Sequence, residues 1–220
     1  MAKQSGPASN ISLRRQNARA EGSEAYASKR SELVAIAAAL FKEHGFEATT
    51  LADIAERAGL DRATVYYYVG SKQELFQTSI EGSLDANLSA AEALLQEKGR
   101  GAIEKIKALL VVLMRSYDRN YPQLYVYIQE QMHQLGNDPS KWSREVQQKT
   151  RRLEAIMREL LDRGVKSGEL RGDLDVRIAV KGLFGMLNWT HRWYKPGSAD
   201  APEVIAETFG RMFFEGLGKQ

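Results

Sequence analysis

The chain has 220 residues, a net charge of +3 and an isoelectric point near 9.0. This length is enough for one large core or two small ones. The absence of cysteine excludes disulfides and thiol catalysis, and three scattered histidines are too few for a metal site. No apolar run reaches the ~18 to 20 residues of a membrane span, and the N-terminus has no apolar signal-peptide core. We therefore expect a cytoplasmic protein with no membrane partner.

Residues 1–27 are rich in serine, alanine and glycine and show no sustained apolar period, which predicts a disordered arm. Up to Ala20, the charged residues of this arm are all basic: Lys3, Arg14, Arg15 and Arg19. The arm is either a DNA-contacting segment or a solvated tail, and the sequence leaves both interpretations open.

A first helix is predicted over residues 31–44, where the apolar residues form one stripe, and Gly45 ends it. Thr50 and Asp53 then form a capping box for a short second helix. Gly59 follows that helix, at a position where a left-handed C-terminal turn favours a residue without a Cβ atom.

Asp61 is placed to cap a third helix over residues 62–68, and Ser71 begins a longer one. Two helices joined by a short turn that contains glycine form a helix-turn-helix, whose second helix enters the DNA major groove. The outward positions of this second helix carry small, polar and aromatic side chains, which suit contact with DNA.

The stretch TVYYYVGSK follows AGLDRA, and LFKEHGFEATTLADIAERAG precedes both. Together they closely resemble the N-terminal domain of the tetracycline-repressor (TetR) family, without a gap from residue 31 to residue 75. The resemblance implies an all-α fold of about nine helices. A three-helix, helix-turn-helix DNA-binding domain would span residues 28–75, and a helical ligand-binding and dimerisation domain residues 76–220. It also implies a transcriptional regulator, most often a repressor, that binds double-stranded operator DNA.

The predicted DNA contacts divide by side-chain chemistry. Arg62 can donate two hydrogen bonds to the edge of a guanine, whereas Ala63 and Thr64 can pack on thymine methyl groups or meet base edges. The remaining predicted contacts fall where similar family members bind phosphates, and they are Thr50, Tyr66, Tyr67 and Lys72.

Two final helices are predicted over residues 176–194 and 202–217, and the first is apolar around more than one face. A helix of that kind needs partners on both sides. By resemblance to the family, these two helices would join their symmetry mates in a homodimer. A palindromic operator also requires a two-fold dimer.

The segment GMLNWTHRWYKPG, residues 185–197, looks like the corresponding helix in TetR-family members that respond to acyl-CoA thioesters. Trp189, Arg192 and Trp193 offer stacking surfaces and a guanidinium that can bind phosphate. Alternatively, the tryptophans pack in the dimer interface and Arg192 pairs with an acid. Four further residues would line a tunnel for the acyl group or fill the core: Tyr117, Tyr121, Tyr125 and Met132.

Other classes of function have less support in the sequence. It contains no glycine-rich phosphate loop, no Gly-x-Ser-x-Gly elbow and no His-Glu-x-x-His pair, so we predict no enzyme, and no cofactor other than an effector ligand. His133 and His191, even with Glu130, are too few ligands for a metal sensor. A multidrug- or aromatic-ligand-sensing repressor of an efflux system is the alternative, although the basic Arg192 and Lys195 argue against a cationic drug.

Overall fold

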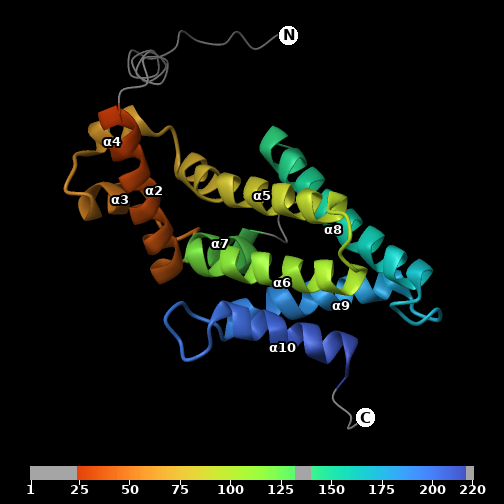
Figure 1. Ribbon diagram of the computed structural model, residues 1–220. Helices are drawn as coiled ribbons and strands as arrows, with labels where there is room; N and C mark the ends of the chain where they lie inside the picture. Colours follow the sequence, from red (N-terminus) through yellow and green to blue (C-terminus); the bar gives the residue numbers. More distant parts are fainter. Residues whose placement is uncertain (1–23, 132–139, 217–220) are drawn as a thin grey trace, which may run out of the picture. The chain divides into compact units, whose positions relative to one another are not determined.

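The computed structural model describes residues 24–131 and 140–216 (Figure 1). Within these ranges the chain forms nine α-helices, one π-helical turn and one 3-10 turn, and it contains no strand. The all-α prediction is therefore confirmed. The chain divides into two compact units, Met1–Ile80 and Glu81–Gln220, and the boundary lies within helix α5 (Lys72–Gln96).

Three helices and the start of α5 make up the first unit: α2 (Glu24–His44), α3 (Leu51–Arg57) and α4 (Arg62–Tyr68). The predicted capping box is present, because the Thr50 backbone N–H donates to the Asp53 carboxylate at 2.7 Å and the Asp53 N–H donates to the Thr50 hydroxyl at 3.2 Å. Gly59 has a φ of 64°, as the predicted left-handed turn requires. The helix over residues 62–68 has the predicted bounds.

Three phenylalanines form the centre of the first unit. Phe41, Phe46 and Phe76 are buried, and their ring centroids lie 5.0, 5.4 and 6.3 Å apart. Ile54 of α3 and Val65 of α4 are fully buried. Burial of these apolar side chains fixes the two helices of the helix-turn-helix on α2 and α5.

The first helix begins earlier than predicted, at Glu24 and not at Ser31. The predicted disordered arm is therefore wrong for residues 24–27, and the rest of that arm lies outside the described residues. The physical reason is Tyr26, which is buried although no apolar period surrounds it. The first unit also extends to Ile80, beyond the predicted boundary at residue 75, because Phe76 packs on Phe41 and Phe46.

The second unit contains the rest of α5 and five further α-helices. Their bounds are Ala102–Arg119 for α6, Gln123–Val126 for α7, Lys141–Ser167 for α8, Val176–Trp189 for α9 and Pro202–Phe214 for α10. Helix α7 continues into the π-helical turn η1 (Tyr127–Gln131), and α9 continues into the 3-10 turn η2 (Thr190–Arg192). Helix α6 packs against α8 and α10, and α8 packs against α9.

Helix α6 is capped by a residue from a distant part of the chain. Its N-cap residue, Gly101, has no side chain, and the Glu169 carboxylate instead accepts hydrogen bonds from the N–H groups of Ala102 and Ile103, at 3.1 and 3.2 Å. These bonds hold the pKa of Glu169 below its usual range. The contact ties the segment after α8 to the start of α6.

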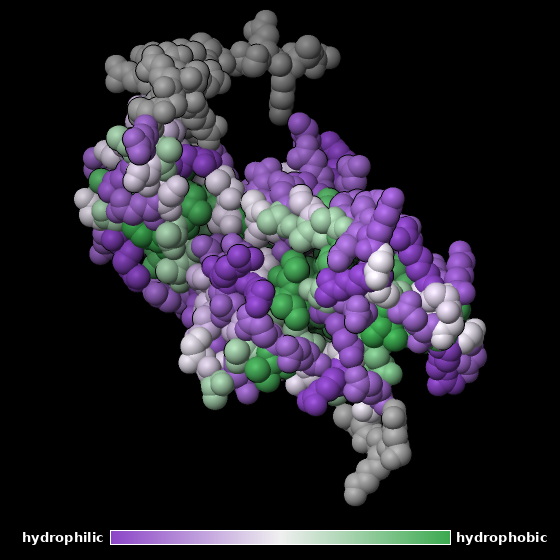
Figure 2. Space-filling model, viewed as in Figure 1, coloured by the Kyte–Doolittle hydropathy of each residue, from purple (hydrophilic) through white to green (hydrophobic). Residues whose placement is uncertain are grey.

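On the face seen in Figure 2, hydrophilic side chains cover most of the surface, and hydrophobic side chains are visible between them. None of the helices in the described ranges is long and apolar enough to cross a membrane.

Candidate DNA-binding surface and effector cavity

The start of helix α4 is fixed by its own cap. The Asp61 carboxylate accepts hydrogen bonds from the Thr64 N–H at 2.8 Å and from the Thr64 hydroxyl at 2.6 Å. These two bonds lower the pKa of Asp61 and keep it ionised at the positive end of the helix. Val65 anchors the opposite side of α4 in the core. The backbone that carries the predicted base contacts is therefore held at both its start and its buried face.

Most of the predicted DNA contacts lie on the surface of the first unit. Arg62 and Ala63 are exposed, Tyr66 is 38% exposed, and Arg62 makes no ion pair within the part of the chain that the structure describes. Thr50 is exposed at the start of α3. Thr64 and Tyr67 are half-buried, and the hydroxyl proton of Thr64 is already donated to Asp61.

Lys72 is half-buried and makes several contacts inside the first unit. Its Nζ donates to the carbonyl oxygens of Phe46 and Glu47, at 2.7 and 2.9 Å, and lies 4.6 Å from the centroid of the Phe46 ring. The carboxylate of Glu47 is 3.9 Å away. Lys72 thus fixes the loop before α3 to the start of α5, whereas its predicted contact with a phosphate stays a prediction.

The structure shows a tyrosine cluster at the end of α4 that the sequence analysis did not predict. The Tyr26 hydroxyl donates to the Tyr68 carbonyl oxygen at 3.2 Å, and its ring centroid lies 5.7 Å from that of Tyr67 and 5.0 Å from that of Tyr68. Tyr26 belongs to the unpredicted first turns of α2. This cluster supports the last turn of the predicted reading helix.

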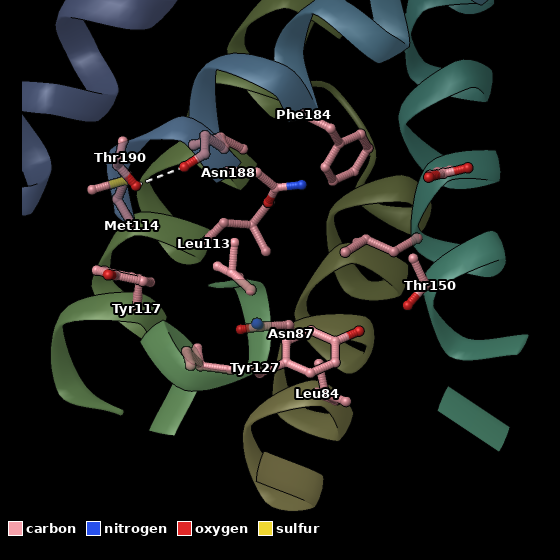
Figure 3. Close-up of a pocket in the computed structure, with 15 residues that line it drawn as sticks. Leu84, Asn87, Leu113, Met114, Tyr117, Tyr127, Thr150, Phe184, Asn188 and Thr190 are labelled. Carbon is pink, nitrogen blue, oxygen red and sulfur yellow. Dashed lines mark hydrogen bonds between the residues drawn. The ribbon is translucent and has the colours of Figure 1, made fainter. Parts of the chain in front are cut away.

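The second unit contains a partly open cavity of about 150 Å³ (Figure 3). Five α-helices and the two short turns η1 and η2 contribute to its wall. The wall is mostly apolar, and its side chains include Leu84, Leu113, Met114, Leu124, Ile128, Leu153, Phe184 and Leu187. A concave, mostly apolar space with a few polar groups is the usual form of a small-molecule site.

The polar residues of the wall differ in their hydrogen-bond partners. The hydroxyls of Tyr127 and Thr150 are hydrogen-bonded to each other, and burial raises the pKa of Tyr127. The Thr190 hydroxyl donates to the Leu187 carbonyl oxygen at 2.6 Å (Figure 3). Asn87 is only 9% exposed, and its amide makes no hydrogen bond within the described residues.

Of the predicted ligand contacts, Tyr117 lines the cavity. It is buried, its hydroxyl has no hydrogen-bond partner, and burial raises its pKa, so the hydroxyl is neutral. Tyr121 and Tyr125 are half-buried and are not part of the cavity wall. Met132 lies outside the described residues.

A row of aromatic rings leads away from Tyr117. Successive centroids are 6.0 Å apart from Tyr117 to Tyr121, 5.8 Å from Tyr121 to Tyr125, 6.3 Å from Tyr125 to His191, and 6.3 Å from His191 to Trp189. The row connects the cavity wall with the end of α9. It brings together residues that the sequence places in two separate segments, 117–125 and 189–191.

The remaining predicted ligand contacts are exposed at the end of α9 and beyond. Trp189 is 60% exposed, and the Arg192 guanidinium lies 5.1 Å from the centroid of its ring. Trp193 is 49% exposed, and its ring packs edge-on against Phe209 of α10. None of these three residues lines the cavity. The structure therefore pairs Trp189 with Arg192 but separates both from the cavity wall.

Most residues of the cavity wall were not predicted from the sequence, although the pattern around Asn87 indicates a candidate binding residue. The apolar stripe of α5 includes the buried residues Ile80, Ala91 and Leu95 and the half-buried Leu84, and Asn87 occupies the position between Leu84 and Ala91 on that stripe. A polar residue within an apolar stripe marks either a satisfied core group or a binding group. Asn87 has no hydrogen-bond partner among the described residues, which favours a binding group over a satisfied core group.

Two family profiles match the sequence. The profile described as bacterial regulatory proteins, tetR family, matches residues 33–78, and the profile described as tetracyclin repressor-like, C-terminal domain, matches residues 99–217, which is more than half of the chain. The chain belongs to the TetR family. It is a DNA-binding transcriptional regulator of this family and not an enzyme.

Similar proteins agree with this assignment. The chain is 29% identical over 189 residues to the HTH-type transcriptional repressor KstR2 of Rhodococcus jostii, covering 86% of this chain and 91% of that protein. The structure of the ketosteroid transcriptional regulator KstR2 of Mycobacterium tuberculosis has a TM-score of 0.79 and 24% identity, covering 87% of this chain and 96% of that one. The structure of AibR in complex with isovaleryl coenzyme A and operator DNA has a TM-score of 0.69 and 18% identity, covering 84% and 97%. The last two likenesses show the fold alone.

Proposed function

We propose that this TetR-family protein is a homodimer that binds a palindromic operator and releases it when a small acyl-CoA thioester binds. The observation that carries the proposal is the apolar cavity of the second unit, whose wall includes Leu84 and Asn87 of α5. Helix α5 begins in the DNA-binding unit and continues into the cavity wall. A ligand that favours one position of α5 would shift the population toward one spacing of the two reading helices.

In the proposed complex with DNA, the exposed residues Arg62 and Ala63 meet base edges, and Thr64 meets them through its methyl group. Arg62 suits a guanine because its guanidinium is exposed and makes no ion pair within the described residues. The phosphate contacts are Thr50, Tyr66, Tyr67 and Lys72. These contacts position the protein, whereas the base contacts carry sequence preference.

The proposed dimer forms through α9 and α10. Besides Trp189 and Trp193, which this proposal assigns to the effector, three of the six exposed large hydrophobic residues in the described ranges lie on these helices: Ile178, Val204 and Met212. An exposed apolar surface of this extent is typical of an interface. Two-fold symmetry then matches the two half-sites of a palindrome.

In this proposal, the acyl group and the coenzyme A portion of the effector bind in different places. A cavity of about 150 Å³ holds a compact acyl group but not a nucleotide. The acyl group would lie against Tyr117, and the coenzyme A portion would extend along Tyr121 and Tyr125 toward Trp189 and Arg192. The Arg192 guanidinium suits a phosphate, and the indole rings suit stacking with adenine. Met132 and Trp193 complete the proposed ligand contacts.

A second candidate is a multidrug- or aromatic-ligand-sensing repressor of an efflux system. The observation that favours it is Glu154, an acid that lines the cavity beside aromatic side chains and could attract a cation. The two candidates differ in the charge of the ligand. A cationic aromatic compound that releases DNA would support this second candidate and contradict the first.

The test is a fluorescence-anisotropy titration of the full-length protein on DNA from the region upstream of its own gene. Isovaleryl-CoA and larger acyl-CoA thioesters should release the DNA, whereas the matching free acids should not. Arg192→Met should raise the thioester concentration needed for release by about tenfold or more and leave DNA affinity unchanged, because it removes a charge-assisted contact to phosphate. DNA binding that no thioester disturbs would contradict the proposed effector.

A further inference from the structure

Asn87 lines the cavity, and its amide makes no hydrogen bond to another described residue. Asn87 is 9% exposed, and Figure 3 shows it beside Leu84, Leu113 and Tyr127. The amide has two donor protons and an acceptor oxygen, none of which bonds to another described residue. Burying such a group is unfavourable unless something in the cavity satisfies it. The amide is therefore available to bind a polar group of a ligand.

The Tyr117 hydroxyl of the wall also has no hydrogen-bond partner, but it offers one donor proton where the Asn87 amide offers two. The Tyr127 and Thr150 hydroxyls bond to each other, and the Thr190 hydroxyl bonds to a backbone carbonyl. Asn188 has other interactions. Asn87 therefore offers a ligand two donor protons and an acceptor oxygen that no other described residue uses.

The charge of the cavity wall restricts the ligand further. No lysine, arginine or histidine lines the cavity among the described residues, and its one charged residue there is the acid Glu154. A carboxylate brought into this space would lose its hydration and meet no cation. A neutral carbonyl, by contrast, can accept a hydrogen bond from the Asn87 NH₂ group without such a cost.

Asn87 is also held in place by contacts on both sides along α5. Asp85 pairs with Lys149 of α8 at 2.5 Å, and Glu92 pairs with Arg152 of α8 at 2.6 Å. Each pair is partly exposed and adds little stability alone. Together they hold α5 next to α8, so the amide keeps its position relative to the Thr150 side of the cavity. A fixed polar group is what discrimination between similar ligands requires.

We propose that Asn87 recognises the carbonyl group of a compact, neutral ligand, such as an ester, thioester or ketone on one ring or a short branched chain, and that the cavity rejects the free carboxylate. The size follows from the volume, since a cavity of about 150 Å³ holds a benzene-sized molecule. The inference rests on the proposed function only in taking this cavity as the effector site.

The first test uses two probes of matched shape and no DNA. Binding of cyclohexanone and of methylenecyclohexane to the full-length protein is measured by ligand-observed NMR titration. The ketone should bind about tenfold more tightly, because it alone accepts a hydrogen bond. Asn87→Leu should abolish this preference and leave the affinity for methylenecyclohexane within about twofold. The control, Ser89→Ala, changes an exposed residue of the same helix and should keep the preference.

A second pair of probes tests the charge. Methyl cyclohexanecarboxylate should bind at least about tenfold more tightly than cyclohexanecarboxylate at neutral pH. Asn87→Leu should also keep a wild-type unfolding midpoint or a higher one, because the amide makes no hydrogen bond that the substitution would break. A lower midpoint would mean that Asn87 has a structural role and would overturn the proposal.

Three further outcomes would overturn it: equal binding of ketone and hydrocarbon, a ketone preference that survives Asn87→Leu, or tighter binding of the carboxylate. These results are separable from the test of the proposed function. If thioesters release operator DNA but the ketone preference does not depend on Asn87, this inference alone is overturned. A carbonyl preference that depends on Asn87, in a protein whose DNA binding no thioester disturbs, would remove the proposed function alone.

Discussion

The ammonium group of Lys72 donates hydrogen bonds to the backbone carbonyls of Phe46 and Glu47, which precede helix α3. Its side chain is 26% exposed, so these charge-assisted bonds are partly shielded from water. At the scale of one residue, Lys72 is thus a structural contact in the first unit. The proposed phosphate contact would use the remaining donor of the same ammonium group.

We expect Lys72→Met to lower the free energy of unfolding by about 1 to 2 kcal/mol, because it removes two charge-assisted hydrogen bonds to carbonyls but keeps the aliphatic stem. Chemical denaturation of the full-length protein, followed by circular dichroism, measures this change. Arg62→Met is the matched control, since Arg62 is an exposed cation of the same unit with no ion pair among the described residues. Equal stability of the two variants would mean that Lys72 has no structural role.

At the scale of an element, helix α4 is positioned by contacts at both ends. Asp61 caps its first turn, and Tyr26 of α2 donates a hydrogen bond to the carbonyl of Tyr68 in its last turn. A seven-residue helix is too short to be stable alone, so these contacts and the burial of Val65 hold its conformation. The first turns of α2 therefore contribute to the proposed DNA-binding surface without contacting DNA.

We expect Tyr26→Phe to loosen the last turn of α4, because it removes the hydrogen bond to Tyr68 but keeps the ring contacts. The loss of about 0.5 to 1.5 kcal/mol should speed amide hydrogen exchange in residues 62–68 by about twofold to tenfold. Tyr66→Phe, which removes a hydroxyl with no partner among the described residues, should leave this exchange unchanged. Faster exchange in both variants, or in neither, would contradict the positioning role of Tyr26.

At the scale of the whole molecule, the proposed recognition of a palindromic operator depends on how two copies assemble. The exposed residues Ile178, Val204 and Met212 of α9 and α10 supply the proposed interface, and Ile178 is 51% exposed. In a symmetric interface, a substituted residue is present twice. The proposed dimer is therefore sensitive to a single charge introduced at Ile178.

We expect Ile178→Glu to raise the dimer dissociation constant by at least about 100-fold, because two unpaired carboxylates would be buried in one interface. Sedimentation velocity at micromolar concentration should then show a monomer, and operator affinity should fall with it. Ala155→Glu, an exposed position on α8, should remain dimeric. A dimeric Ile178→Glu variant with normal operator binding would place the interface elsewhere.

The sequence by itself determined the helix-turn-helix, because its signals are local. The capping box of Thr50 and Asp53, the left-handed turn at Gly59 and the cap at Asp61 each depend on residues within a few positions of one another, and all are present. The family assignment followed from the same stretch. Local signals are therefore sufficient to predict this part of the chain, although tertiary contacts hold it in place.

The cavity was decided only by the tertiary structure, because its wall combines residues from distant segments of the sequence. Tyr117 was predicted as a ligand contact for its chemistry and does line the cavity, whereas Trp189 and Arg192 form an exposed pair outside it. In the sequence, Asn87 is recognisable only as a polar residue within the apolar stripe of α5. Whether a buried amide finds a partner depends on which helices pack against it, and that is a property of long-range packing, which no local pattern encodes.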